Sequence, residues 1–428
     1  MTQCGRFASA EGVVVVSRNI ERRWGAVAGV AILAGALVGC SSPQSPPDRV
    51  QMNFQVSTDS QGTYDVPPHL PDGNRGDVIA SASQGVDVGL GASNRVTLLY
   101  RSVNSRGQDV VVSGVLLIPQ GEAPDGGWPL ISWAHGTVGI ADRCAPSHSP
   151  TMGGEFNGEY VKSLLNAGYA VAATDYIGLG TPGDHTYMGA IDQGNAVADI
   201  VPAVRQINPQ LSENWFVIGH SQGGAAALSA TRAGAKGQRP SGLKAVIAIG
   251  PGNSAESALQ AVIDGTDTDP FAPALDLFVL IGAAAADQNI HLEEILSPQG
   301  QKIVDEVRNN TCLADLLNNT RSLPGADIFL HDSRTIAELS QRLRIYGNPD
   351  NGPTNGPVLI ITGDADTIVP TAGTLKLIDN LRRQGSEIDD LVLPGQGHIQ
   401  PLYDSFCEQQ RFLAAHSGPP APQTCPKR

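Results

Sequence analysis

The stretch Trp215-Phe-Val-Ile-Gly-His-Ser221-Gln-Gly-Gly-Ala-Ala-Ala-Leu228 decides the fold. Its first four residues are apolar and typical of a short buried strand, and its last residues are small and typical of a tightly packed helix. Ser221 lies in the turn between them. Gly219 and Gly223 let the backbone approach itself closely there, which leaves the serine hydroxyl exposed above the helix N-terminus. The stretch therefore predicts a serine nucleophile on a strand-turn-helix.

The surrounding sequence has to support this prediction, because 49 of the 428 residues are glycine and a Gly-x-Ser-x-Gly match alone is weak. Eight apolar runs predict strands. The first two alternate in polarity around a Ser-Arg-Gly turn and predict an antiparallel hairpin, and the other six are continuously apolar, as buried parallel strands are. The eight runs are 95–103, 109–118, 130–134, 170–174, 215–218, 245–249, 358–362 and 388–393.

Helical stretches alternate with these strands, which predicts an α/β fold with a mostly parallel eight-stranded sheet and helices on both faces. About a hundred residues separate the strands 245–249 and 358–362, far more than the dozen of a simple crossover. Helix-prone segments 273–286 and 301–309 lie in this insertion. We interpret it as a helical cap over the site; the alternative is a helical decoration elsewhere.

The predicted boundaries follow from these runs and from the N-terminus. They are a signal peptide at 1–39, a tether at 40–60, a core at 61–250 and 356–428, and a cap at 251–355.

A serine nucleophile needs a base and an orienting acid, which follow it in the order Ser, acid, His on this kind of strand-turn-helix. Asp364 and Asp366 both follow the strand 358–362, and the spacing to the neighbouring glycine and Val-Pro favours Asp366. The alternative role for Asp364 is that of a turn residue. His398 follows the last strand and is the predicted base, whereas His416 lies in the polar C-terminal region.

Attack on a carbonyl creates an oxyanion, which backbone N–H groups stabilise. Gln222, directly after the nucleophile, is the predicted first donor. Thr137, in the loop after strand 130–134, is the predicted second donor, with His135 and Gly136 shaping that loop. The alternative is an ordinary turn at the end of a strand. This chemistry needs no metal and no organic cofactor.

The N-terminus has the pattern of an export signal, because arginines precede the apolar stretch 24–38. That stretch is too short to span a bilayer. Leu37-Val-Gly-Cys40 closes it and resembles a bacterial lipobox, in which Cys40 would carry a lipid anchor. The alternative is an ordinary secretory signal, and the route of export stays open.

Charge argues against a nucleic-acid partner. The formal net charge is −14, and it becomes −16 without residues 1–39, which hold four Arg and two Glu. A surface this acidic repels a phosphate backbone. Length and composition fit one large globular enzyme with an insertion as well as two domains, and they leave the oligomeric state open.

Four cysteines remain when Cys4 and Cys40 are set aside, and none of them has the spacing of metal ligands. Disulfides suit an exported protein. Four cysteines allow three pairings, of which we favour Cys144–Cys312 with Cys407–Cys425.

Four motifs occur in order: 133–137 (Trp-Ala-His-Gly-Thr), 175–183 (Asp-Tyr-Ile-Gly-Leu-Gly-Thr-Pro-Gly), 219–223 and 363–370. With them the chain resembles the secretory lipases, a lipase A-like branch of the α/β-hydrolases, over residues 90–415. The resemblance implies an esterase or triacylglycerol lipase with Ser221, Asp366 and His398 as its triad, and a cap that binds the acyl chain. It also supports the favoured disulfide pairing. The lipobox and the short C-terminal segment depart from the family, and the latter argues against a C-terminal flap.

Sequence therefore predicts hydrolysis of lipid or other acyl esters through an acyl-serine intermediate. Short-chain esterases, cell-envelope esterases, peptidases and acyltransferases share the triad and stay as alternatives. A non-catalytic surface lipoprotein is the alternative from another class, and the complete triad argues against it. Haloalkane or epoxide hydrolysis on this fold needs an aspartate nucleophile, and position 221 is serine.

Overall fold

The computed structural model describes residues 64–70, 72–267, 269, 272–313, 315, 325–330, 333–419 and 425, all within one unit, Pro47–Arg428. The predicted signal peptide at 1–39, the acylated Cys40 and the tether at 40–60 lie outside the described residues. Within those ranges, no helix has both the length and the apolar character needed to cross a membrane.

A single sheet forms the centre of the described chain, with nine strands in the spatial order β1-β2-β3-β5-β4-β6-β7-β8-β9. Pairing is antiparallel from β1 to β5 and parallel from β5 to β9. The predicted α/β fold with a mostly parallel sheet is confirmed, but the count of eight strands is one too low. The strands are β1 Val78–Asp87, β2 Ala92–Val103, β3 Asp109–Ile118, β4 Trp128–Ala134, β5 Ala170–Thr174, β6 Leu211–His220, β7 Leu243–Ile249, β8 Val358–Gly363 and β9 Ile388–Leu393.

The strand missing from the prediction is β1, at the edge of the sheet. Its sequence, Val-Ile-Ala-Ser-Ala-Ser-Gln-Gly-Val-Asp, mixes apolar residues with Ser, Gln, Gly and Asp, and none of the ten residues is buried. Edge strands need no buried face, because they pair on one side only. The ladder to β2 holds β1 in place, with irregular register around Gly85.

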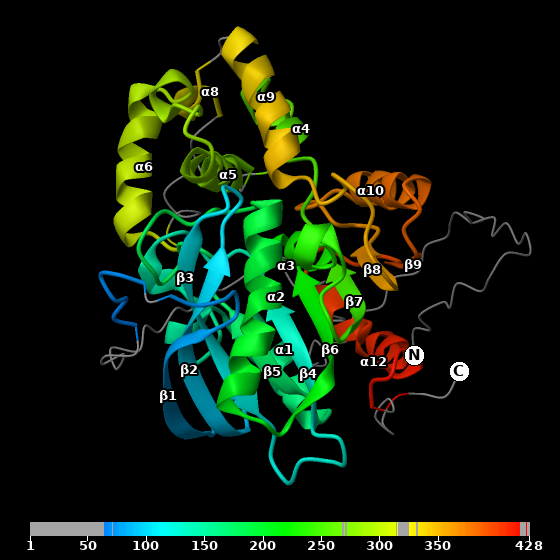
Figure 1. The fold of residues 1–428 in the computed structure, drawn as a ribbon. Helices are drawn as coiled ribbons and strands as arrows, with labels where there is room; N and C mark the ends of the chain where they lie inside the picture. The colour runs from blue at the N-terminus through cyan, green and yellow to red at the C-terminus, as the bar shows by residue number, and fades with distance from the viewer. Residues whose placement is uncertain are drawn as a thin grey trace, which may run out of the picture. The chain divides into compact units, whose positions relative to one another are not determined.

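Helices cover both faces of the sheet (Figure 1). Alternate residues of β6 point to opposite faces: Trp215 and Val217 pack with α2, α3 and α10, while Phe216 and Ile218 pack with α1 and α12. The helices of these layers are α1 Glu155–Asn166, α2 Ala190–Ile207, α3 Gln222–Ala230, α10 Thr371–Arg383, α11 Gln400–Asp404 and α12 Phe406–Ala415, with short 3₁₀ turns at Asp142–Cys144, Pro146–His148 and Ala235–Gly237.

The insertion between β7 and β8 forms a helical layer with its own apolar cluster. In Figure 1 it lies beyond the ends of β6 and β7, on the side where the parallel strands finish. The expected helices 273–286 and 301–309 correspond to α5 and α6. The described helices here are α4 Ala255–Ile263, α5 Ala272–Ala286, α6 Pro298–Asn310, α8 Gly325–Ile328 and α9 Ser333–Gly347, with a 3₁₀ turn at Leu292–Glu294.

Two disulfides are present in the pairing that we favoured, so the prediction of disulfide bonds is confirmed. Cys144–Cys312 joins the loop after β4 to the insertion, and Cys407–Cys425 joins the first turn of α12 to a residue beyond the end of that helix. A β-bridge between Gly139 and Cys312 reinforces the first connection. The insertion is therefore tied covalently to the loop that carries Thr137.

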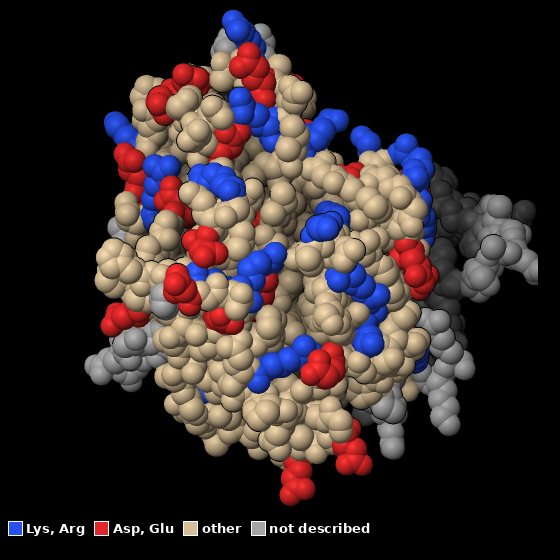
Figure 2. Space-filling model, in the orientation of Figure 1, with Lys and Arg blue, Asp and Glu red and all other residues tan. Residues whose placement is uncertain are grey.

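Surface charge is mixed on the face shown in Figure 2, where acidic and basic side chains are interspersed over the insertion and the adjoining core. No continuous basic area occurs on that face. The prediction that nucleic acid is not the partner continues to rest on the net charge of −14.

The two disulfides close loops of very different length, with sequence separations of 168 and 18 residues. Chain entropy predicts about 5 kcal/mol of stabilisation for the longer loop and about 3 kcal/mol for the shorter. We expect the double variant Cys144→Ser/Cys312→Ser to lose about 2 kcal/mol more unfolding free energy than Cys407→Ser/Cys425→Ser in urea denaturation. An equal or reversed order would contradict this expectation.

Candidate active site

Ser221 lies at the turn between β6 and α3 in an unusual backbone conformation. Its φ is 59° and its ψ is −119°, a region that costs free energy for any residue with a side chain. The side chain is half-buried, whereas the flanking residues His220 and Gln222 are buried. This is the geometry of a nucleophile elbow, as the sequence predicted.

The two glycines of the motif are required by close backbone contacts. A Cβ on Gly219 would lie 2.0 Å from the carbonyl oxygen of Gly223, and a Cβ on Gly223 would lie 1.9 Å from that of Ala134. Real side chains cannot occupy such positions. The glycines therefore allow the turn and bring it against the end of β4.

His398 and Asp366 form a buried pair next to this turn. His398 Nδ1 donates to Asp366 Oδ2 at 2.7 Å, and the side chains are 6% and 1% exposed. The other carboxylate oxygen accepts from the backbone N–H groups of Ile368 and Val369 at 3.0 and 2.9 Å. These bonds fix the carboxylate and leave His398 Nε2 as the free ring nitrogen, without a hydrogen-bond partner among the described residues.

Short contacts bring this pair to the serine. Ser221 N–H donates to Ile249 O at 2.9 Å, and a Cβ on the next residue, Gly250, would lie 3.1 Å from the His398 ring. The His220 and His398 rings are 4.8 Å apart, and His220 Nε2 donates to His398 O at 3.0 Å. No hydrogen bond joins Ser221 to His398 in the described chain; such bonds are often long before a substrate binds.

The competing residues have other positions. Asp364 is exposed and accepts from Gly395 N–H at 2.6 Å, which makes it a turn residue. His416 follows α12 and bonds Phe412 O at 2.8 Å. The structure thus groups Ser221 with Asp366 and His398.

Two backbone N–H groups are suited to bind an oxyanion. Within the described chain, neither Thr137 nor Gln222 donates its N–H to another group. Gly136 holds the Thr137 loop beside the nucleophile, because a Cβ on it would lie 3.5 Å from Ser221 Cβ. Both donors predicted from sequence are therefore available near the serine.

The motif 175–183 supports the loop that carries Thr137 through buried hydrogen bonds. Asp175 is fully buried and accepts hydrogen bonds from Ser113 Oγ at 2.7 Å and Ser147 N at 2.8 Å. Tyr176 Oη donates to His135 O at 2.9 Å. Sequence motifs pointed to this segment without giving its role, which is to position the residues before Thr137.

Two buried histidines near the serine were not singled out by sequence. Burial lowers the pKa of His185 and that of His220, each to about 3, so both rings are neutral. Neutral His185 donates from Nδ1 to Ile177 O at 2.9 Å and accepts at Nε2 from the Gln222 side chain at 3.0 Å. His185 thereby holds the predicted oxyanion donor Gln222.

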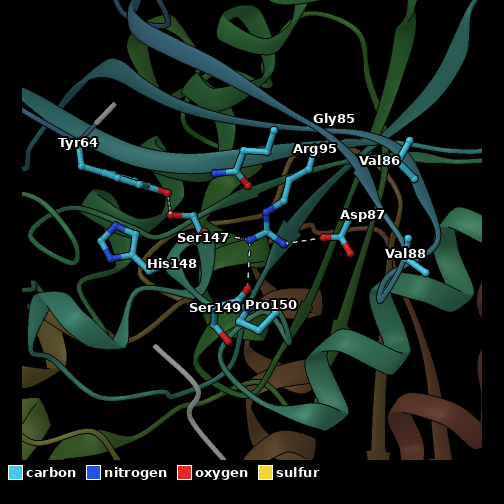
Figure 3. Close-up of a pocket in the computed structure, with 11 residues that line it drawn as sticks. Tyr64, Gly85, Val86, Asp87, Val88, Arg95, Ser147, His148, Ser149 and Pro150 are labelled. Atoms are coloured by element: carbon cyan, nitrogen blue, oxygen red, sulfur yellow. Dashed lines mark hydrogen bonds and ion pairs between the residues drawn. The ribbon is translucent and has the colours of Figure 1, made fainter. Parts of the chain in front are cut away.

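A surface pocket of about 260 Å³ lies at the edge of the sheet formed by β1 and β2, and Figure 3 shows the residues that line it. Arg95 at its centre bonds Asp87 at 2.9 Å and the carbonyl oxygens of Ser147 and Ser149 at 2.9 and 3.1 Å. Its strand β2 lies four strands from β6, or roughly 19 Å at the usual spacing. The pocket's polar groups bond one another and hold Ser147, which in turn supports Asp175.

A known protein family matches the part of the chain that carries this site. The family model described as serine aminopeptidase, S33, matches residues 154–398, more than half of the chain. The chain belongs to this family. No curated protein matches this S33-family chain significantly.

Solved structures share its fold. Lipase A from Candida antarctica in its closed state aligns with a TM-score of 0.71 and 18% identity, over 86% of this chain and 87% of that one. The rice cell wall degrading esterase LipA from Xanthomonas oryzae aligns with a TM-score of 0.62 and 21% identity, over 76% and 92%. The predicted resemblance to lipase A-like α/β-hydrolases is confirmed at the level of the fold.

The elbow glycines of this S33-family chain provide one test of the geometry. We expect Gly223→Ala to cost at least about 3 kcal/mol or to prevent folding, because its Cβ would meet the Ala134 carbonyl oxygen. Gly89→Ala is a matched control, since its Cβ meets only the Asp87 side chain at 3.4 Å. Urea denaturation compares the two, and equal stability would contradict the proposed contact.

The buried histidines predict how stability depends on pH. Unfolded histidine has a pKa near 6.5, whereas folded His185 and His220 stay neutral down to about 3. Below pH 6.5 the unfolded state binds more protons, so the free energy of unfolding falls as pH falls through this window.

We expect a loss on the order of 2 kcal/mol for each histidine between about pH 7.5 and pH 5. In His185→Gln, the loss of unfolding free energy between these two pH values should be smaller by about 2 kcal/mol, the contribution of one histidine. Urea denaturation at both values measures it, and equal wild-type stability at the two would refute it.

Proposed function

We propose that this S33-family protein is an exported serine ester hydrolase that cleaves carboxylic esters through an acyl-Ser221 intermediate. The observation that carries the proposal is the 2.7 Å bond from His398 to Asp366, which orients a histidine with a free Nε2 beside an elbow serine. Fold likeness to a lipase and to an esterase supports the same class of reaction.

The proposed reaction has two half-cycles, acylation and deacylation, and His398 acts first as a base and then as an acid in each. Ser221 Oγ attacks the ester carbonyl while His398 Nε2 takes its proton, and the N–H groups of Gln222 and Thr137 bind the oxyanion. The C–O bond to the alcohol breaks as His398 returns the proton to the leaving oxygen. Water then attacks the acyl-enzyme while His398 Nε2 takes its proton. The bond between the acyl carbon and Ser221 Oγ breaks as His398 returns that proton to Ser221 Oγ, and the acid leaves. Asp366 orients the imidazole and stabilises its cation.

We infer medium or long acyl chains as the preferred substrates. The insertion contains a packed cluster of buried aliphatic and aromatic side chains, including Leu277, Phe278 and Ile281. This apolar material supports the inference, because an acyl chain needs apolar surroundings. A short-chain or cell-envelope esterase remains an alternative on the same triad. The family description favours a second candidate, an aminopeptidase, which would use the same acyl-serine step on an amide.

We also propose export and lipid attachment at Cys40. The apolar stretch 24–38 and the lipobox-like quartet support export through a processed signal, and two disulfides suit an oxidising compartment. Mass spectrometry of the mature N-terminus tests the anchor. An acylated Cys40 would support it, and a free N-terminus at another residue would refute it.

Nitrophenyl esters of increasing chain length, beside aminoacyl nitroanilides, test the reaction class. We expect ester hydrolysis to exceed anilide hydrolysis and to rise toward medium chains. Ser221→Ala should lower kcat by a factor of about 10⁴ to 10⁶. Equal rates for wild type and this variant would end the enzyme proposal, and faster anilide cleavage would favour the aminopeptidase.

The two competing aspartates provide a matched pair of variants. Asp366→Asn should lower kcat by about 10⁴, because the amide no longer fixes the ring tautomer of His398. Asp364→Asn removes only the charge at an exposed turn, because the amide oxygen can still accept from Gly395 N–H, and it should change kcat by less than about threefold. The reverse order would assign the acid to Asp364.

A further inference from the structure

A buried hydroxyl pair joins the Thr137 loop to another segment. Thr137 Oγ1 and Tyr187 Oη are 2.7 Å apart, and the two residues are 8% and 4% exposed. Burial raises the pKa of Tyr187 to about 12, so the phenol stays neutral and acts through its hydrogen bond. Neither the motifs nor the proposed reaction gives this tyrosine a role.

Helices of the cap hold Tyr187 from two sides. On α5, a Cβ on Gly282 would lie 2.4 Å from Tyr187 N, so the helix backbone packs directly on that of the tyrosine. The Phe278 ring of the same helix lies 5.7 Å from the Tyr187 ring. On α9, Tyr346 Oη donates to Tyr187 O at 3.0 Å.

Neighbours of Tyr187 contact the rest of the site. His185 holds the Gln222 side chain at 3.0 Å. Met188 packs on Gly252, where a Cβ would lie 2.7 Å from Met188 Cε, and Gly252 N–H donates to Ser221 O at 3.0 Å. One short segment, 185–188, thus contacts the residues of both oxyanion donors and a neighbour of the nucleophile.

We propose that Tyr187 is a positioning residue for ester hydrolysis, an inference that rests on the proposed function. Its hydroxyl holds Thr137 where the Thr137 N–H meets the oxyanion, and its backbone, packed against α5 and α9, makes that position depend on the seating of the cap. A transition-state donor displaced by a fraction of an ångström loses much of its effect, while substrate binding in the cap is little changed.

A double-mutant cycle with Tyr187→Phe and Thr137→Val tests this role, because each removes one hydroxyl of the pair. We expect each single variant to lower kcat by about 10- to 100-fold with KM changed by less than about threefold. The double variant should be no more than about threefold slower than the worse single variant, because the two hydroxyls act as one unit.

Tyr169→Phe is the matched control. Tyr169 is also fully buried, and its hydroxyl has no hydrogen-bond partner in the described chain. We expect its kcat to equal that of wild type. Thermal unfolding of every variant separates positioning from loss of fold, and if Tyr187→Phe does not fold, Thr137→Val breaks the same bond from the other side.

The outcomes are separable. Wild-type kcat in Tyr187→Phe, equal losses in Tyr187→Phe and Tyr169→Phe, or multiplicative losses in the double variant would each overturn the role of Tyr187 and leave ester hydrolysis standing. A folded wild-type protein without esterase activity would overturn the proposed function and this inference with it. A kcat loss confined to the Tyr187–Thr137 pair supports the inference.

Discussion

The positive φ of Ser221 is the constraint on which the rest of the site depends. It exists because three backbones meet without side chains between them: the end of β4, the turn at Gly219, and the start of α3 at Gly223. Strain of this kind persists only where surrounding packing fixes it. The sheet supplies that packing, and the strained turn places Ser221 next to the end of β7, where its N–H donates to Ile249 O at 2.9 Å.

The insertion between β7 and β8 is linked closely to the loop that carries Thr137. The Cys144–Cys312 disulfide, the bridge at Gly139 and the Tyr187 contacts all connect cap residues to the loop that carries Thr137. A change in the position of the insertion therefore reaches Thr137 through short, buried links. If the proposed function holds, this arrangement lets substrate binding at the insertion affect the chemical step without any contact to the proposed triad.

Much of the fold and of the site could be predicted from local patterns. Alternating runs located β2 and β3, continuously apolar runs located β4 to β9, and the predicted triad residues follow such strands. Strand β1 was not predicted because its few apolar residues are mixed with Ser, Gln, Gly and Asp, and none of its residues is buried. His185 and Tyr187 were not predicted for another reason. Each contacts a partner far away in sequence, Gln222 for His185 and Thr137 for Tyr187. A single histidine or tyrosine has no characteristic spacing that would reveal such a contact.

The central claim is that Ser221 is the nucleophile, and covalent labelling tests it most directly. A fluorophosphonate reacts with a serine only when a neighbouring base activates it. Peptide mapping after labelling should place one adduct on Ser221 in the wild-type protein and none in His398→Gln. An adduct on another residue, or an unlabelled Ser221 in a protein that hydrolyses esters, would contradict the account.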